Sequence, residues 1–91
     1  MIRKTDGLKH KLPQIETARG AALARLGRYE EALAAARKAV DLKPNSKDAA
    51  GAYLVFSFVF KKFGREVEAM MNFNRALELN PKLKITSLLK A

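Results

Sequence analysis

The sequence predicts an all-α protein built from antiparallel helix hairpins, and three observations support this fold class. The chain repeats itself, because a shift of about 37 residues places Gly27 on Gly64 and Pro44 on Pro81 without a gap. Within each copy apolar residues recur at three- and four-residue intervals, which collects them on one face of a helix. Each copy also has a central glycine, which can end one helix and allow a tight turn into the next. Such a short turn forces the paired helices to run antiparallel.

The first copy covers about residues 13–44. Its first helix is predicted from a stripe of apolar residues before Gly27: Ile15, Ala18, Ala22, Leu23 and Leu26. Its second helix follows at once, with the apolar residues Ala32, Leu33, Ala36, Ala39, Val40 and Leu42. Pro44 ends this helix, because proline disfavours the helical conformation in the residue before it.

The second copy covers about residues 47–81, with helices at about 48–63 and 65–79 on either side of Gly64. Asn80 can cap and Pro81 can begin a further C-terminal helix at about 81–91. Residues 1–12 show no clear period, contain Gly7 and precede Pro13. We therefore expect them to form a flexible or loosely packed basic lead.

The pattern of the second copy resembles the tetratricopeptide repeat. The residues that carry the resemblance are Tyr53, Phe56, Ser57, Phe60, Ala69, Phe73, Ala76 and Pro81. The first copy has Gly20, Ala32, Ala39 and Pro44 in place, but Glu16 and Arg19 stand where the family prefers large apolar residues. The resemblance covers residues 14–81, and it implies a right-handed superhelical stack of two repeats, closed by the C-terminal helix as a cap.

The resemblance also implies where the helices cross and how the repeats are spaced. Small residues, Gly20 with Ala32 and Ser57 with Ala69, would lie where paired helices approach closely. The family period is 34 residues, so this spacing is about three residues longer. We expect the extra residues between Pro44 and Tyr53, as a longer loop or an early extra turn.

In this family the first helix of each repeat lines a concave surface that holds a peptide or a partner helix. The residues that the resemblance places on this surface are Thr17, Ala18, Ala21, Arg25, Leu54, Val55, Phe58, Lys61 and Lys62. The alternative is that the apolar members are ordinary core and the cations a solvated face. The family's lysine and asparagine clamp for a terminal carboxylate is not supported, since Thr17, Ala21 and Val55 occupy its positions.

Residues 52–60 are apolar all the way round a helix, so something must cover every side of it. Leu54, Val55 and Phe58 would be covered by the C-terminal helix, by a second copy of the chain or by a ligand. We expect a protein or peptide partner with apolar anchors, whose acidic residues meet Arg25, Lys61 and Lys62. Self-association is the alternative that the sequence leaves open.

The composition argues against other classes of function. The chain has no cysteine, and its single histidine, His10, lies in the basic lead, so we expect neither catalysis nor a metal or other cofactor. A net charge of +9 makes RNA binding the main alternative function, but the excess charge gathers at the two ends rather than along one helix. No apolar run approaches the roughly 20 residues of a membrane span, and no secretory leader is visible, which favours the cytoplasm.

Overall fold

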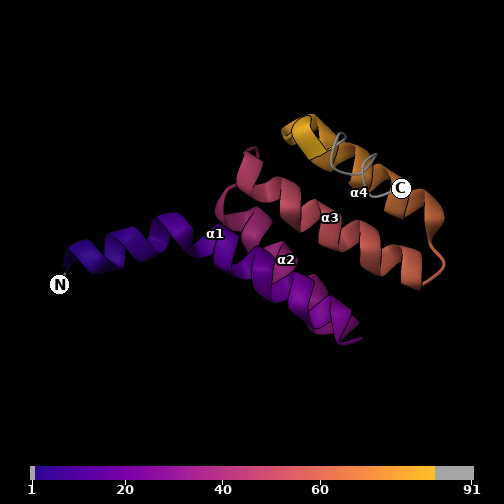
Figure 1. Cartoon of the computed structure of the whole chain (residues 1–91), viewed down its shortest axis with the longest axis horizontal. Coiled ribbons are helices and arrows are strands. Elements are labelled where there is room, and N and C mark those ends of the chain that lie inside the picture. Colours follow the sequence, from indigo (N-terminus) through magenta and orange to yellow (C-terminus); the bar gives the residue numbers. More distant parts are fainter. Residues whose placement is uncertain (1, 84–91) are drawn as a thin grey trace.

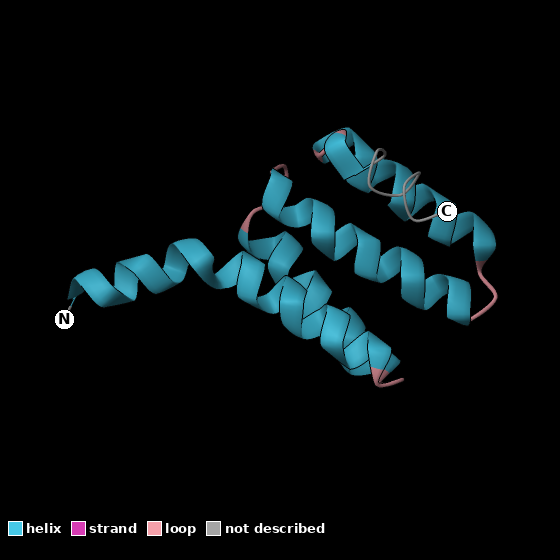
Figure 2. Ribbon diagram, in the orientation of Figure 1, coloured by secondary structure: helices cyan, strands magenta, loops and turns pink. Residues whose placement is uncertain are grey.

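The chain folds into four helices that form two hairpins. In this computed structural model the backbone is described for residues 2–83 and the side chains for residues 12–83. The helices are α1 (Ile2–Arg25), α2 (Tyr29–Leu42), α3 (Lys47–Lys62) and α4 (Glu66–Leu79), and short turns connect them (Figures 1 and 2). The predicted all-α hairpin architecture is therefore confirmed for the described residues.

Both hairpins close with the same turn. Gly27 and Gly64 have φ values of +80° and +79°, in the left-handed region that glycine enters without a Cβ clash. The amide of Arg28 donates to Leu23 O at 2.9 Å, and the amide of Arg65 donates to Phe60 O at the same distance. These bonds satisfy carbonyls that the end of a helix leaves without partners. The predicted matching bends at the two glycines are confirmed.

The second hairpin stacks on the first through α3. Helix α3 contacts α1, α2 and its own partner α4, whereas α4 contacts only α3 among the described helices. The connection between α2 and α3 is short, since α2 ends at Leu42 and α3 begins at Lys47. The extra residues of the longer repeat period therefore form an early turn of α3 rather than a long loop.

The core is made mostly of alanine. The central cluster contains Ala24, Ala32, Ala36, Ala39, Ala52, Val55 and Val59. A Cβ added to Gly20 would lie 3.2 Å from Ala32 O, which confirms that α1 and α2 cross closely at these two residues. At the corresponding crossing of α3 and α4, Ala69 is buried and Ser57 is half-buried beside a surface hollow.

Helix α1 begins earlier than the sequence pattern predicts. The backbone is helical from Ile2, within the stretch expected to form a lead, and Pro13 lies inside the helix with its side chain fully buried. In Figure 1 the first part of α1 extends away from the two hairpins and changes direction before it joins them. A helical segment that does not pack needs no apolar stripe, which explains why its period is missing. Proline at position 13 can account for the bend.

The predicted C-terminal helix at about 81–91 lies largely outside the described residues. The chain is helical at Lys82 and Leu83, where the description ends. Within the described part, none of the helices is both long enough and apolar enough to cross a membrane. The division of the chain into a lead and a domain that starts at residue 13 stays a prediction.

Candidate functional site

A groove runs between α1 and α3, on the side of the stack where the first helices of the two hairpins lie next to each other. It encloses about 490 Å³. The residues that line it are Thr17, Ala21, Ala24 and Arg25 from α1, and Gly51, Leu54, Val55 and Phe58 from α3. Because both helices present residues at intervals of three and four, each contributes one continuous face.

The floor of the groove is formed where α1 and α3 approach most closely. A Cβ added to Gly51 would lie only 2.7 Å from Thr17 Cγ2, so the absence of a side chain at position 51 permits this approach. Ala24 and Val55 are buried at 4% and 5% exposure and belong to the core. The hydroxyl of Thr17 is buried and has no hydrogen-bond partner among the described residues. The floor is therefore apolar except for the hydroxyl of Thr17.

The rim of the groove combines an aromatic ring with positive charge. Phe58 is 42% exposed, and Lys62 Nζ lies 5.3 Å from the centroid of its ring. Arg25 is exposed at the rim on the α1 side. None of the described residues that line the groove is acidic. The groove thus offers an apolar surface beside cations, which is complementary to an apolar segment that carries acidic residues.

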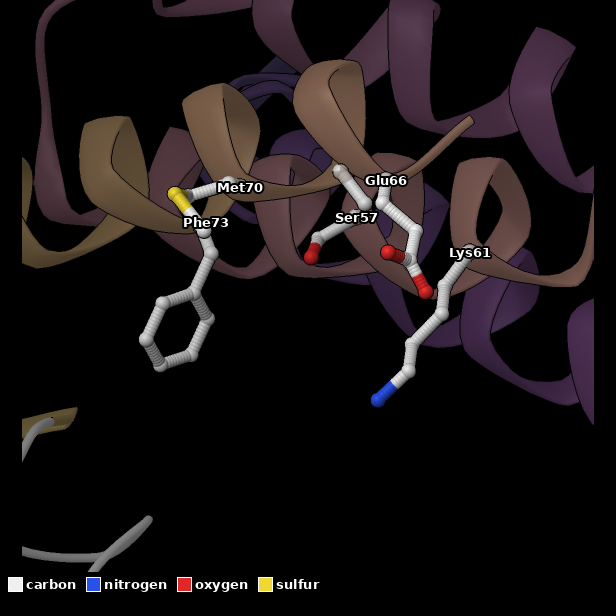
Figure 3. Close-up of a pocket in the computed structure, with 6 residues that line it drawn as sticks. Ser57, Lys61, Glu66, Met70 and Phe73 are labelled. Atoms are coloured by element: carbon white, nitrogen blue, oxygen red, sulfur yellow. The ribbon is translucent and has the colours of Figure 1, made fainter. Parts of the chain in front are cut away.

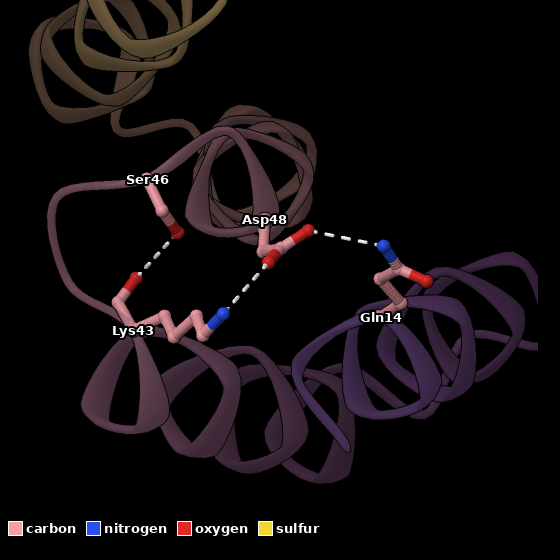
Figure 4. A network of polar contacts seen from close by, with 4 residues as sticks. All are labelled: Gln14, Lys43, Ser46 and Asp48. Carbon is pink, nitrogen blue, oxygen red and sulfur yellow. Dashed lines mark hydrogen bonds and ion pairs between the residues drawn. The ribbon is translucent and has the colours of Figure 1, made fainter. Parts of the chain in front are cut away.

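A polar network fixes the start of α3 against the first hairpin (Figure 4). Gln14 Nε2 donates to Asp48 Oδ1 at 3.1 Å, and Lys43 Nζ lies 4.0 Å from Asp48 Oδ2. The Ser46 hydroxyl donates to Lys43 O at 3.0 Å, which closes the turn before α3. Asp48 thereby links α1, the end of α2 and the first turn of α3, where its charge also suits the positive end of the helix dipole. This network connects the start of α3 to the first hairpin.

The comparisons with known proteins agree with this geometry. Residues 15–46 match the family described as Tetratricopeptide repeat. These residues are therefore similar to a tetratricopeptide repeat. No curated protein and no solved structure matches the chain.

The matched repeat contains the groove-lining part of α1, the turn at Gly27, all of α2 and the connection to α3. The family match falls on the first hairpin, although the residue pattern of the second hairpin resembled the family more fully. The second hairpin reproduces the turn of the first in its glycine φ and its hydrogen bonds. The groove therefore lies between the hairpin that matches the family and a second hairpin with the same turn geometry.

The structure brings together six of the nine residues that the sequence placed on this surface. They are Thr17, Ala21, Arg25, Leu54, Val55 and Phe58. Lys62 joins them at the edge through its contact with Phe58. Ala18 is exposed outside the groove, and Lys61 lines a different hollow.

Sequence reasoning missed two lining residues, Ala24 and Gly51. Helical spacing could have found both. Ala24 follows Thr17 by seven positions, and Gly51 precedes Leu54 and Val55 by three and four. These are the intervals that place residues on one helical face. Small residues were overlooked because they contribute little surface, although their size is what lets the two helices meet.

A second hollow, the one that Lys61 lines, lies between α3 and α4 (Figure 3). We call it the α3–α4 hollow. It encloses about 400 Å³ and is lined by Ser57, Lys61, Glu66, Ala69, Met70 and Phe73. The side chains of Lys61 and Glu66 lie beside each other on its rim in Figure 3. Neither makes an ion pair within the described part of the chain, so both charges remain available at this surface.

The described residues do not assemble a metal-binding cluster. Between residues 12 and 83, no group of three or more His, Asp or Glu side chains is placed to hold a metal ion. The one buried acid, Glu16, lies 3.6 Å from Lys38 Nζ and 3.9 Å from Arg19 Nη1. The contact with Lys38 links α1 to α2, whereas the contact with Arg19 lies within α1, so Glu16 has a structural role in the first hairpin.

Proposed function

We propose that the groove between α1 and α3 binds a peptide or a helix of a partner protein. The observation that carries the proposal is the composition of the groove: an apolar floor, an exposed aromatic ring and a rim on which the described charged residues are positive. A tetratricopeptide repeat at residues 15–46 supports an interaction module, because repeats of this family act by holding other proteins. The partner favoured by this chemistry is an apolar segment flanked by acidic residues.

Two features of the groove define what the partner must supply. Phe58 and Leu54 offer an apolar wall, so an apolar side chain of the partner would be desolvated against them. Arg25 and Lys62 stand at the rim in water, where opposite charges contribute more to the association rate and to specificity than to affinity. The apolar anchor should therefore dominate the affinity, and the acidic residues should select which partners bind.

The proposal is tested by selecting, from a displayed random peptide library, the peptides that bind the full chain. Enrichment of peptides with apolar anchors and neighbouring acidic residues is expected. The selected peptides should bind Phe58→Glu at least about tenfold more weakly, since one buried anchor contact is worth at least about 1.4 kcal/mol. Lys61→Glu is the matched control, because it reverses a charge on α3 in the α3–α4 hollow rather than in the groove. Equal loss in both variants would overturn the assignment of the groove.

RNA binding is the second candidate, and the net charge of +9 favours it. Six of the described basic residues are already within ion-pair distance of acidic ones: Arg19, Arg28, Lys38, Lys43, Arg65 and Arg75. Those pairs interrupt any continuous basic surface on the hairpins. Titration with a single-stranded oligouridylate at rising salt separates the candidates, because phosphate contacts weaken steeply with salt concentration. Binding of this probe at micromolar concentration, lost by Arg25→Glu and by added salt, would favour RNA over a peptide.

A further inference from the structure

The groove between α1 and α3 offers few hydrogen-bond partners to the backbone of a bound peptide. Two of its eight lining residues, Thr17 and Arg25, have polar side-chain atoms. The Thr17 hydroxyl is buried, so Arg25 is the accessible one. The backbone N–H and C=O groups of the two helices are paired within the helices. An extended peptide would therefore lose hydrogen bonds to water against Leu54 and Phe58 without replacing them, which costs free energy.

A partner helix avoids this cost because its backbone groups are already paired. The apolar part of the groove extends from Gly51 to Phe58 on α3, which is about 10 Å at the rise of an α-helix. Two turns of a partner helix cover this length, so apolar residues at i, i+3, i+4 and i+7 would face the groove. The small side chains of Ala21 and Ala24 leave room for those larger apolar residues.

Helices α1 and α3 run parallel to each other along the groove. Three pairs of residues lie close together across the two hairpins, and each pair has the same sequence separation of 34. The pairs are Gln14 with Asp48, Thr17 with Gly51 and Tyr29 with Phe63. A constant separation means that the two helices point in the same direction. Their carboxyl ends therefore lie at one end of the groove, which we call the turn end because the two glycine turns follow it.

The two ends of the groove differ in charge. Arg25 is in the last turn of α1 and Lys62 is in the last turn of α3, so both lie at the turn end. Both are exposed, and neither is within ion-pair distance of an acidic side chain in the described part of the chain. The opposite end has mixed charge, since Asp48 Oδ2 lies there 4.0 Å from Lys43 Nζ and Lys47 is the preceding residue. Acidic residues of a partner are therefore attracted most strongly to the turn end.

We propose that the partner binds in the groove as an amphipathic helix antiparallel to α1 and α3, with acidic residues in its first turn at the turn end. This inference rests on the proposed function and adds the conformation and the direction of the partner. Acidic residues stabilise the first turn of a helix, where the helix dipole is positive. In this direction the same residues also meet Arg25 and Lys62. In the reverse direction they would lie in the last turn, where the dipole disfavours them.

The conformation of the partner is tested with a synthetic peptide of about 16 residues, because shorter helices are marginal in water. It carries leucine at i, i+3, i+4 and i+7 and glutamates in its first turn, and its ends are acetylated and amidated to remove their charges. Its control has proline at i+5, on the side of the helix away from the leucines, which breaks the helix and keeps every apolar residue. The helical peptide should bind at least about tenfold more tightly than the proline control.

The direction of the partner is tested by NMR with a nitroxide on either end of the same peptide. A nitroxide at the amino end should broaden the amide signals of Arg25 and Lys62 more than those of Thr17 and Gly51. A nitroxide at the carboxyl end should give the reverse pattern. A version with lysines in place of the glutamates should bind the wild-type chain at least about fivefold more weakly, and the double variant Arg25→Glu with Lys62→Glu should prefer this lysine peptide.

The outcomes separate this inference from the proposed function. Equal binding of the helical and proline peptides would show an extended occupant, and a nitroxide at the amino end that broadens Gly51 most would show the reverse direction. Either result would overturn the inference, as would failure of the designed helix to bind while library peptides bind the wild type and not Phe58→Glu. The proposed function survives in each of these cases. It fails together with the inference if the designed helix and the library peptides all bind Phe58→Glu as tightly as the wild type.

Discussion

The methyl group of Thr17 on α1 lies directly over the backbone of Gly51 on α3, so that a Cβ at position 51 would be 2.7 Å from Thr17 Cγ2. This contact sets the distance between the two helices that form the groove. The contact therefore affects both the stability of the stack and the shape of the proposed binding surface. Two small substitutions, Gly51→Ala and Thr17→Ala, can test it.

We predict that the effect of Gly51→Ala depends on residue 17. Alanine in place of glycine should favour a helix interior by about 1 kcal/mol. In the wild-type chain the clash with Thr17 offsets this gain, and Thr17→Ala removes the clash. The free energy of unfolding, measured by urea denaturation, should rise for Gly51→Ala in the Thr17→Ala background and stay level or fall in the wild type. Additive effects of the two substitutions would show that the helices do not meet here.

Gly27→Ala and Gly64→Ala should lower the free energy of unfolding by similar amounts, about 1–2 kcal/mol each. An added Cβ at either position meets nothing within 4 Å, so the loss comes from the left-handed backbone alone. Asparagine tolerates this conformation better, so Gly27→Asn and Gly64→Asn should lose less stability than the alanine variants. If alanine greatly lowered the free energy of unfolding at one of these glycines and not at the other, the two turns would not be equivalent.

The alanine core should not accept a larger side chain. Ala36 is fully buried, and its amide nitrogen would lie 3.5 Å from a Cβ at Gly20, so Ala36→Leu would force α1 and α2 apart. We expect a loss of about 1–3 kcal/mol in the free energy of unfolding. The matched control is Ala34→Leu, which makes the same change on the exposed side of α2 and should alter stability by less than about 0.5 kcal/mol. If Ala36→Leu left the free energy of unfolding unchanged, α1 and α2 would have to be able to separate at this crossing.

The sequence was sufficient to predict the hairpins because the signals that define them are local. A glycine that must adopt positive φ and a proline after a helix act within a few residues, so their repetition at Gly27 and Gly64 determines both turns. The residues on each side of the groove can be predicted from local spacing in the same way, since residues on one face of a helix remain together wherever the helix packs.

The position of Lys61 and the start of α1 both depend on packing, which a local sequence pattern does not describe. Each step along a helix turns a side chain by about 100°, so adjacent residues face different neighbours. Lys62 follows Phe58 by four positions and remains beside it, whereas Lys61 follows Ser57 by four and lines the α3–α4 hollow. The helix before Pro13 gave no periodic signal in the sequence, because a segment whose backbone extends away from the hairpins, as in Figure 1, needs no apolar stripe.

The outer face of α4 leads to a prediction about self-association. Val67, Met70 and Met71 are 74%, 65% and 65% exposed, and the first hairpin has Glu30, Leu33 and Ala34 at the corresponding positions. Apolar side chains gathered on one exposed helix face favour association of two chains. We expect the chain to form dimers as its concentration rises, and the double variant Val67→Glu with Met71→Ala, which copies the first hairpin, to remain monomeric.

Light scattering across a dilution series measures this equilibrium, and the groove variant Phe58→Glu identifies the surface that mediates it. Dimers through α4 should persist in Phe58→Glu, because Phe58 lines the groove between α1 and α3 and not the face formed by Val67 and Met71. The opposite result, in which Phe58→Glu is monomeric and the α4 double variant still dimerises, would make the groove a subunit interface. A peptide partner would then have to compete with a second copy of the chain, so peptide affinity would fall as the protein concentration rises.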